Sequence, residues 1–416
     1  DTTRARVRRA AVVAAAASVL VALVTVIAAE GVRVWFSLDP DESRWAVEAA
    51  AVGLPFLALT NVWLGATRGL KIMRYTLYIF WAGQPLLWIA FILAGWQLSE
   101  RPWVAVLAYS LSWAVAAAAA FAAWHRESSG WPGGRLVRGE GGRLLRYAGP
   151  RAPAALFSQL LFWTDLFVLT RFATDQAVGV YSGALRAGQV VVLFLTSVNL
   201  MFSPFVADLY NRGEIAALDR LFKSLTRWTL GVTLPLFVVL AVAPRPVLEL
   251  FGPSFSEGHS ALLILLAGQL VNVATGGAGF VLLMIGRTGW DLAVYAASFA
   301  LNVALALWLC PRYGIEGAAV ANGVTFACSN AVRLVLVKRF AGIQPYDRAY
   351  GRLLLPAGAA AVAGWAAHRL VDGSGADLVV TAAAVVAAYA AGLVAAGLTR
   401  DERAAAKRLA GRIQAR

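Results

Sequence analysis

The feature that most constrains this sequence is a series of apolar stretches, each roughly 20 residues long, separated by polar loops. A helix needs about 20 residues to cross a hydrocarbon core that is about 30 Å thick. Lipid offers backbone N–H and C=O groups no hydrogen-bond partner, so stretches of this kind must be helical. The sequence therefore predicts an all-α fold, a polytopic bundle of transmembrane helices.

The composition supports this assignment and limits the partners. Of the 416 residues, 60% are hydrophobic and 14% are charged. A soluble domain of this size could not bury so much apolar surface. In a soluble protein, the formal net charge of +14 would suggest nucleic acid. Here we assign it to arginines that anchor loops at the membrane surface. We therefore expect the lipid bilayer as a partner, and no nucleic acid.

Hydropathy and the positions of the charged residues predict about twelve spans. Their expected ranges are 10–29, 46–66, 74–95, 103–124, 152–171, 179–206, 228–250, 260–284, 290–310, 317–337, 352–370 and 377–398. Basic residues gather in every second loop, most densely between residues 126 and 151. Loops rich in Lys and Arg stay on the cytoplasmic side. We expect a multi-pass protein of the cytoplasmic (cell) membrane with both termini cytoplasmic.

The second half of the chain repeats the spacing of the first. An offset of 217 residues carries span starts at 10, 45, 74 and 103 close to later starts near 227, 262, 291 and 320. Internal repeats are common in transporter folds, whose sites lie at the repeat interface. The repeat predicts two pseudo-repeated halves around a central cavity. It also predicts two helices that would precede residue 1, and so fourteen in all.

These patterns divide the chain into three parts. Residues 1–148 would form an N-terminal half bundle of four spans with a basic cytoplasmic loop. Residues 149–343 would form a C-terminal half bundle of six spans. Residues 344–416 would add an extra helix pair and a basic cytoplasmic tail.

Several short motifs in the second half resemble one family. They are WTDLFVL at 163–169, VGVYSGALR at 178–186, PFVADLY at 204–210, LFGPSF at 250–255 and PRYGIEGAAVA at 311–321. The last is similar to the pattern P-x-x-G-I-x-G-A-A-x-A. In order and spacing, the motifs resemble the polysaccharide and oligosaccharide flippases (polysaccharide biosynthesis proteins) of the multidrug/oligosaccharidyl-lipid/polysaccharide exporter superfamily. The resemblance also marks residues 218–225 as a short cytoplasmic amphipathic segment.

The resemblance implies a transporter without a cofactor. It would translocate lipid-linked oligosaccharide or polysaccharide repeat units across the cytoplasmic membrane by alternating access. The expected substrate is a polyprenyl-pyrophosphate-linked oligosaccharide, and polysaccharide-assembly proteins are further candidate partners. Two alternatives stay open within the superfamily: a cation-coupled multidrug antiporter and a flippase for peptidoglycan lipid precursors. The family normally has fourteen helices, and the first two would be absent here.

Two charges inside predicted spans are the leading site candidates. Asp165 lies about 9 Å before the outer end of its span, and Arg186 about 10 Å into the next one. Antiparallel neighbours would place both at similar depth. One interpretation is a buried ion pair that fixes helix packing. The other is that Arg186 binds the pyrophosphate, because a guanidinium fork matches phosphate oxygens.

Further polar residues lie inside predicted spans. As a group they could line a cavity for sugar hydroxyls, although hydrogen bonding between helices explains each one singly. The candidates are Gln84, Gln189, Gln269, Asn272 and Asn302. Pro85 is expected to kink the third span, and Gly276-Gly277 is expected to let the eighth span bend.

The sequence gives little support for an enzyme. A membrane glycosyltransferase or ligase would need acid and base groups on a sizeable outer loop. The outer loops are short, and their acidic residues cluster only at 39–42. Cys310 and Cys328 fall at or within apolar stretches and suggest neither a disulfide framework nor a metal site. We expect no catalytic residues, no metal and no cofactor. A non-catalytic scaffold for polysaccharide assembly remains an alternative.

Overall fold

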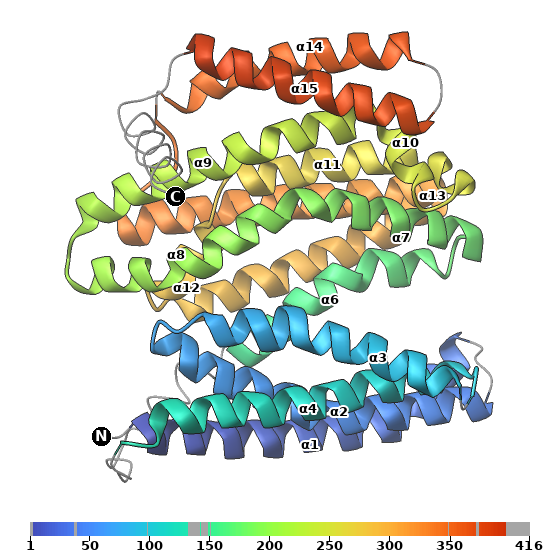
Figure 1. Ribbon diagram of the computed structural model, residues 1–416, viewed down its shortest axis with the longest axis vertical. Coiled ribbons are helices and arrows are strands. Elements are labelled where there is room, and N and C mark those ends of the chain that lie inside the picture. Colours follow the sequence, from blue (N-terminus) through green and yellow to red (C-terminus); the bar gives the residue numbers. More distant parts are fainter. Residues whose placement is uncertain are drawn as a thin grey trace, which may run out of the picture. The chain divides into compact units, whose positions relative to one another are not determined.

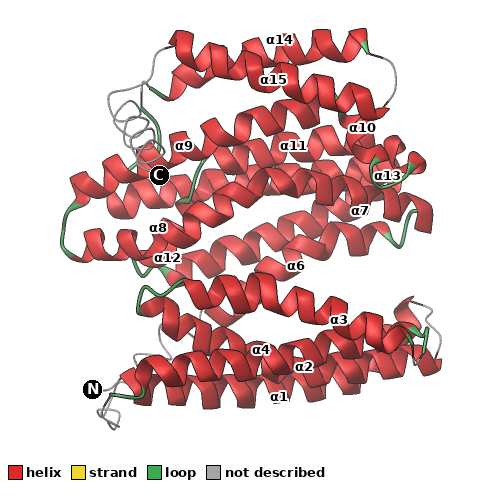
Figure 2. Cartoon of the chain, in the orientation of Figure 1, coloured by secondary structure: helices red, strands yellow, loops and turns green. Residues whose placement is uncertain are grey.

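The computed structural model describes residues 3–36, 40–97, 99–131, 142, 149, 151–347, 349–371 and 374–396. Every regular element in these ranges is a helix, and none is a strand (Figure 2). This confirms the predicted all-α class. Most of the long basic loop, between residues 132 and 150, and the tail from residue 397 lie outside the described residues. The chain divides into two compact units, Asp1–Arg143 and Leu144–Arg416.

The first unit is a small bundle of apolar helices (Figure 1). Its elements are α1 (Thr3–Phe36), α2 (Pro40–Gly69), a π-helix (Thr76–Gly83) that runs into α3 (Gln84–Trp96), and α4 (Pro102–Ser128). The distortion expected at Pro85 takes the form of this π-helix, which ends directly before Gln84. π-turns in helices are often found at functional sites.

The second unit contains the remaining helices (Figure 1). They are α6 (Arg151–Leu169), α7 (Asp175–Gln189), a 3-10 turn (Val190–Val192), α8 (Leu193–Asn211), α9 (Ile215–Val242), α10 (Pro244–Glu249), a 3-10 helix (Pro253–Gly258), α11 (His259–Ala274), α12 (Ala278–Met284), α13 (Thr288–Ala341), a 3-10 turn (Tyr350–Leu353), α14 (Leu354–Leu370) and α15 (Ser374–Ala396).

Among the residues that the structure describes, ten helical segments are long and apolar enough to cross a membrane. They are Thr3–Gly31, Arg44–Gly69, Thr76–Trp96, Trp103–Ser128, Arg151–Leu169, Asp175–Asn211, Ile215–Val242, Pro253–Ala274, Thr288–Ala341 and Gly375–Ala395. The predicted spans 290–310 and 317–337 both fall within the 54 residues of α13. The predicted span 352–370 corresponds to α14, which has 17 residues. The chain is a multi-pass membrane protein, and the number twelve stays a prediction.

The long helix α13 consists of two helices that meet at Gly314. The backbone there is non-helical, with φ 54° and ψ −127°. A Cβ atom on Gly317 would stand 2.4 Å from the carbonyl oxygen of Leu309, so the chain doubles back within a few residues. Glycine alone adopts positive φ at little steric cost. The turn brings the two ends of α13 to the same end of the unit.

A second break separates α11 from α12, where the sequence predicts a bend. Gly276 has φ +64°, and a Cβ on this residue would stand 2.2 Å from the hydroxyl oxygen of Thr226 in α9. The neighbouring Gly277 lies equally close to Asn199 of α8, since its Cβ would be 2.2 Å from the amide oxygen. The bend at Gly276-Gly277 is therefore confirmed. Both positions need glycine, because α9 and α8 approach the backbone too closely for a side chain to fit.

The segment 218–225, expected to be a short cytoplasmic amphipathic segment, lies in the first part of α9. Leu218 and Phe222 are fully buried in an apolar cluster with Val206, Leu282 and Val337. This apolar face packs against α8, α12 and the end of α13, while Arg220 on the same segment is exposed, so the segment is amphipathic as expected. Its cytoplasmic location stays a prediction.

Candidate functional site

A cavity lined by both polar and apolar residues lies within the second unit. Its volume is about 310 Å³. Its walls come from α6, the 3-10 turn Val190–Val192, α8, α11, α12, both halves of α13 and the break between α11 and α12. The lining residues are Arg151, Ser158, Gln159, Leu161, Phe162, Val192, Leu195, Thr196, Asn199, Asn272, Gly276, Gly277, Gly279, Phe280, Leu283, Asp291, Tyr295, Phe326, Asn330 and Arg333. Charged and amide side chains thus meet inside the helix bundle of the second unit.

Three charged residues stand at one end of this cavity. Arg151 begins α6, Asp291 lies in the first turn of α13, and Arg333 lies near the end of the same helix. The guanidinium of Arg151 donates to the carboxylate of Asp291 at 3.0 Å. Asp291 is 3% exposed and Arg151 is 39% exposed. The carboxylate is therefore the buried partner of a pair that reaches toward solvent.

Arg333 is the least compensated of these charges. Its side chain is 7% exposed, and its Nε and Nη2 atoms are buried without a hydrogen-bond partner among the described residues. The guanidinium lies 4.4 Å from the ring centroid of Tyr295. Such a cation–π contact is worth about 0.5–2 kcal/mol. Removing an ion from water costs several kcal/mol, so this contact alone does not offset the burial of the charge.

A chain of amides forms part of the cavity wall. Asn272 donates to Gln269 at 3.2 Å and accepts from Asn330 at 3.1 Å. Asn330 also donates to the carbonyl of Phe326 at 2.9 Å. The hydroxyl of Tyr350 donates to the carbonyl of Ala274 at 2.8 Å, beside the break between α11 and α12. Burial raises the pKa of Tyr350 above its ordinary value, so this donor stays protonated.

Asp165 does not line the cavity. It is completely buried between α6, α7 and α13, and its Oδ2 atom accepts hydrogen bonds from Tyr181 and, at 2.9 Å, from Asn322. Its Oδ1 atom is buried without a partner among the described residues. The predicted ion pair between Asp165 and Arg186 is therefore wrong. Tyr181, and not Arg186, is the residue of α7 that faces the carboxylate.

Arg186 is exposed on α7. It lies 11 residues after Asp175, which corresponds to about 16 Å along a helix. This distance is about half of a hydrocarbon core. A charged side chain at that depth normally faces a partner or water, and rarely lipid. No ion pair to Arg186 is formed within the described part of the chain.

The other candidates lie in different places. Gln84 belongs to the first unit, where it is buried and donates to Ser112 at 2.9 Å. Gln189 ends α7 and is half-buried. Asn302 is completely buried in α13, and its Oδ1 and Nδ2 atoms have no partner among the described residues. Asn272 lines the cavity and Gln269 supports it, so two of the seven candidates belong to this site.

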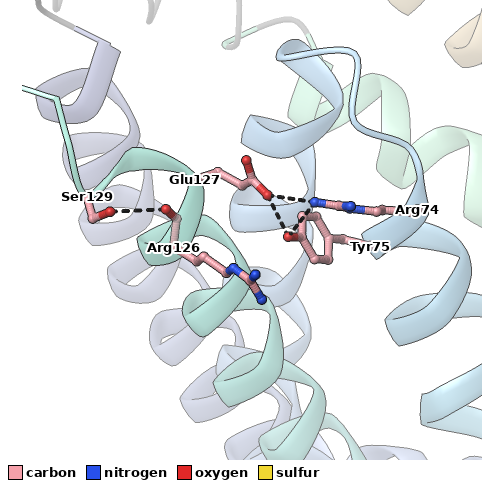
Figure 3. A network of polar contacts seen from close by, with 5 residues as sticks. All are labelled: Arg74, Tyr75, Arg126, Glu127 and Ser129. Atoms are coloured by element: carbon pink, nitrogen blue, oxygen red, sulfur yellow. Dashed lines mark hydrogen bonds and ion pairs between the residues drawn. The ribbon is translucent and has the colours of Figure 1, made fainter.

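The first unit has its own polar network at one end of α4 (Figure 3). Tyr75 donates to Glu127 at 2.6 Å, and Arg74 donates to the same oxygen at 3.0 Å. The side chains of Arg74 and Glu127 are 60% and 23% exposed. An exposed pair of this kind contributes about 0–1 kcal/mol. The network joins the start of the third span to the end of α4 and holds none of the seven predicted site residues.

Sequence reasoning missed the three charges of the cavity. Arg151 was assigned to the basic loop, and Asp291 and Arg333 were not singled out as candidates. Asp291 and Arg333 do fall within predicted spans, at 290–310 and 317–337. The sequence did contain a signal for this site: two opposite charges lie in consecutive predicted spans, near the same predicted membrane surface.

Comparisons with known proteins confirm the resemblance inferred from the motifs. Residues 150–308 match the MatE family. A probable low-salt glycan biosynthesis flippase of Haloferax volcanii is 25% identical over 206 residues, which is 48% of this chain and 43% of that protein. A probable flippase of the same organism is 23% identical over 205 residues, again 48% of this chain and 43% of the relative. The chain thus aligns with less than half the length of these relatives.

Solved structures share the fold. The lipid II flippase MurJ, in an inward closed conformation, has a TM-score of 0.67 and 13% identity, covering 90% of this chain and 80% of that chain. A transporter of the MOP superfamily from Pyrococcus furiosus has a TM-score of 0.62 and 14% identity, covering 80% and 78%. At these identities the likeness establishes that the fold is shared, and nothing beyond the fold.

Proposed function

We propose that this multi-pass membrane protein, whose residues 150–308 form a MatE domain, is a flippase for lipid-linked oligosaccharide or polysaccharide repeat units. It would move them across the cytoplasmic membrane by alternating access and would not be an enzyme. The observation that carries this proposal is the charge of the interior cavity, which holds two arginines and one aspartate. Relatives named as flippases support the same assignment.

The charge of the cavity favours an anionic substrate. A cationic drug would meet the guanidinium of Arg333, whose Nε and Nη2 atoms lack a hydrogen-bond partner among the described residues, and like charges in a medium of low dielectric constant repel strongly. The pyrophosphate of a polyprenyl-linked sugar carries the opposite charge, and guanidinium groups bind phosphate oxygens through two parallel hydrogen bonds. A cation-coupled multidrug antiporter is therefore the weaker alternative. A flippase for peptidoglycan lipid precursors fits the same chemistry. Only the sugar attached to the lipid pyrophosphate would distinguish its substrate from that of a polysaccharide flippase.

Arg186 is the second cation that this function would use. Its exposure at mid-span depth fits a side chain that faces an aqueous path between the membrane surfaces. The glycine break at Gly276-Gly277 and the turn at Gly314 are suited to a hinge role, since hinges are short segments that absorb changes in φ and ψ. We also propose that Gln84, Gln189 and Asn302 are available to sugar hydroxyls when these segments move.

Orientation is a separate proposal with its own test. The charged end of the cavity is the end that the positive-inside rule places in the cytoplasm, where lipid-linked sugars would be loaded. Reporter fusions after Asp39 and after Arg138 should report opposite compartments, with the second one cytoplasmic. Fusions that report the same compartment would contradict both the predicted orientation and the proposal that both termini are cytoplasmic.

Purified protein in proteoliposomes tests the function. A polyprenyl-pyrophosphate oligosaccharide in both leaflets is treated with an impermeant glycosidase. Without the protein, about half of the sugar should remain protected; with the protein, we expect nearly complete cleavage as inner-leaflet molecules reach the outer leaflet. Vesicles whose sugar stays half protected, but which accumulate a cationic dye under a proton or sodium gradient, would support the antiporter instead.

A further inference from the structure

We infer that a groove in the first unit holds one anionic phospholipid of the bilayer, with its phosphate at the arginines that begin α1 and its acyl chains along α4. The groove lies between α1 and α4, which both pack along α2 (Figure 1). Its volume is about 620 Å³. All the described residues that line it belong to the first unit, and the inference does not depend on the proposed function.

The first argument is the charge at one end of the groove. Arg4 and Arg8 lie one helical turn apart on α1, and His125 lies near the end of α4. The described residues that line the groove include no acidic side chain. Arg4 donates to the carbonyl of Trp131 at 3.4 Å, which holds the start of α1 beside the end of α4. Basic side chains that share a pocket between helices, with no carboxylate among them, favour the phosphate of an anionic lipid.

The second argument is a buried hydroxyl group. Ser128 lines the groove, its side chain is completely buried, and its Oγ atom has no hydrogen-bond partner among the described residues. A serine in a helix often donates to a carbonyl one turn earlier, as the neighbouring Ser129 does to Arg126 at 3.1 Å. A buried donor without an acceptor costs free energy. A phosphate or ester oxygen in the groove would supply the acceptor.

The third argument is that the groove changes from charged to apolar along its length. On the same face of α1 as Arg8 lie Ala11 and Ala15, whose small side chains leave space between the helices. Ala15 is seven residues after Arg8, which corresponds to about 10 Å along the helix. The facing wall is aromatic, since the ring centroids of Trp63 in α2 and Phe121 in α4 are 5.1 Å apart. This order matches a charged headgroup followed by acyl chains.

The groove also opens toward the bilayer. Val12 lines it and is 64% exposed, so a lipid can enter sideways between α1 and α4. The first predicted span begins at residue 10, which places Arg4 and Arg8 at the level of the headgroups. The predicted cytoplasmic start of the chain would face the leaflet whose surface potential is negative. A membrane lipid therefore fits both parts of the groove, whereas a soluble phosphate would use only the charged end.

The experiment measures the affinity of the first bound lipid by native mass spectrometry of the purified, delipidated full chain. The probe is dioleoyl phosphatidylglycerol, and dioleoyl phosphatidylcholine carries the same chains without the net negative charge. We expect the phosphatidylglycerol to bind at least about tenfold more tightly. Soluble glycerophosphate should compete weakly even in excess, because it buries no acyl chain. Equal affinities for the two lipids would overturn the anionic site, and effective competition by glycerophosphate would overturn the lipid assignment.

Two neighbouring arginines provide a matched pair of variants. Arg8→Gln removes a charge that lines the groove and should weaken binding of phosphatidylglycerol by at least about tenfold, because a charge-assisted hydrogen bond to phosphate is lost. Arg9→Gln removes the same charge at the same depth, but the exposed side chain of Arg9 does not line the groove. It should change the affinity by less than about twofold. Equal losses in the two variants would assign the effect to the net charge of the helix start and contradict a built site.

A second pair of variants leaves every charge in place. Ala11→Phe fills the groove and should weaken binding of phosphatidylglycerol severalfold, whereas Ala16→Phe, at an exposed position of the same helix, should not. Unchanged binding in folded Ala11→Phe overturns the site even if Arg8→Gln fails to fold. A dimer that Ala11→Phe converts to a monomer, with lipid binding unchanged, would identify a second copy of the chain as the occupant and also overturn the lipid site.

The buried hydroxyl has its own test. Ser128→Ala should weaken binding of phosphatidylglycerol severalfold and leave the thermal stability of the lipid-free protein unchanged, because the hydroxyl has no partner among the described residues to lose. A loss of lipid-free stability with unchanged lipid affinity would assign Ser128 to packing and contradict its role as a ligand to the lipid.

Discussion

Under the proposed function, flipping of a lipid-linked oligosaccharide is expected to fall by at least about 100-fold when Arg186 is replaced by alanine. The guanidinium is exposed about 16 Å along α7, where a charge facing lipid would be strongly unfavourable. If it contacts the passing pyrophosphate through a two-pronged hydrogen bond, its removal costs about 3–6 kcal/mol at about 1.5–3 kcal/mol for each bond. The glycosidase-protection assay in proteoliposomes measures the loss.

The controls for Arg186 follow from its setting. Arg186→Lys keeps the charge without the planar fork, and we expect partial activity. Arg171→Ala changes another exposed arginine, located in the turn after α6, and should leave flipping within about twofold. All three variants should elute as folded protein, because the side chain of Arg186 is not part of the packed interior. Full activity of Arg186→Ala would remove this residue from the transport path.

The rotation of residues about the helix axis was not predictable from the sequence. Asp165 and Arg186 were placed at similar depth by counting residues. Tyr181 and Arg186 are five residues apart on α7, which at 100° per residue places them about 140° apart around the helix. Tyr181 faces Asp165, so Arg186 faces away. Because Tyr181 and Arg186 are both polar, the sequence did not show which of them faces Asp165.

The cavity was missed for a related reason. Arg151 and Arg333 stand close to the basic loops, and the positive-inside rule explains an arginine there without any site. Asp291 and Arg333 come together because α13 doubles back at Gly314, which returns its end to the level of its start. The turn at 311–321 was visible as a motif. The side chains that it brings together depend on packing over the whole length of two helices.

The helix breaks were predicted more successfully because their cause is local. A pair of glycines lets a helix end and restart, and Gly276-Gly277 does so between α11 and α12. For the amphipathic segment, a pattern of apolar residues along one face predicts that this face is covered, but does not say what covers it. Residues 218–225 are covered by neighbouring helices and not by the membrane surface.

Replacing Asp165 by alanine is expected to destabilise the protein by about 2–6 kcal/mol. The substitution leaves the hydroxyl of Tyr181 and the amide of Asn322 buried without their acceptor, and each lost partner costs about 1–3 kcal/mol. Asp165→Asn keeps an acceptor oxygen in the same place and should cost less than half as much. Thermal unfolding in detergent, followed by tryptophan fluorescence, measures the difference. Asp208→Ala, which removes an exposed ion pair, should change stability by less than about 1 kcal/mol.

A second substitution tests whether orphaned donors are the cause. Adding Tyr181→Phe to Asp165→Ala removes one of the two unsatisfied groups, so the double variant should be more stable than Asp165→Ala alone, although Tyr181→Phe destabilises the unmodified protein. Additive losses would contradict the hydrogen-bond account.

The variant Asp165→Asn also separates stability from transport. If it folds normally but shows no flipping under the proposed function, the carboxylate would be assigned to energy coupling, because packing is retained while only the charge is gone.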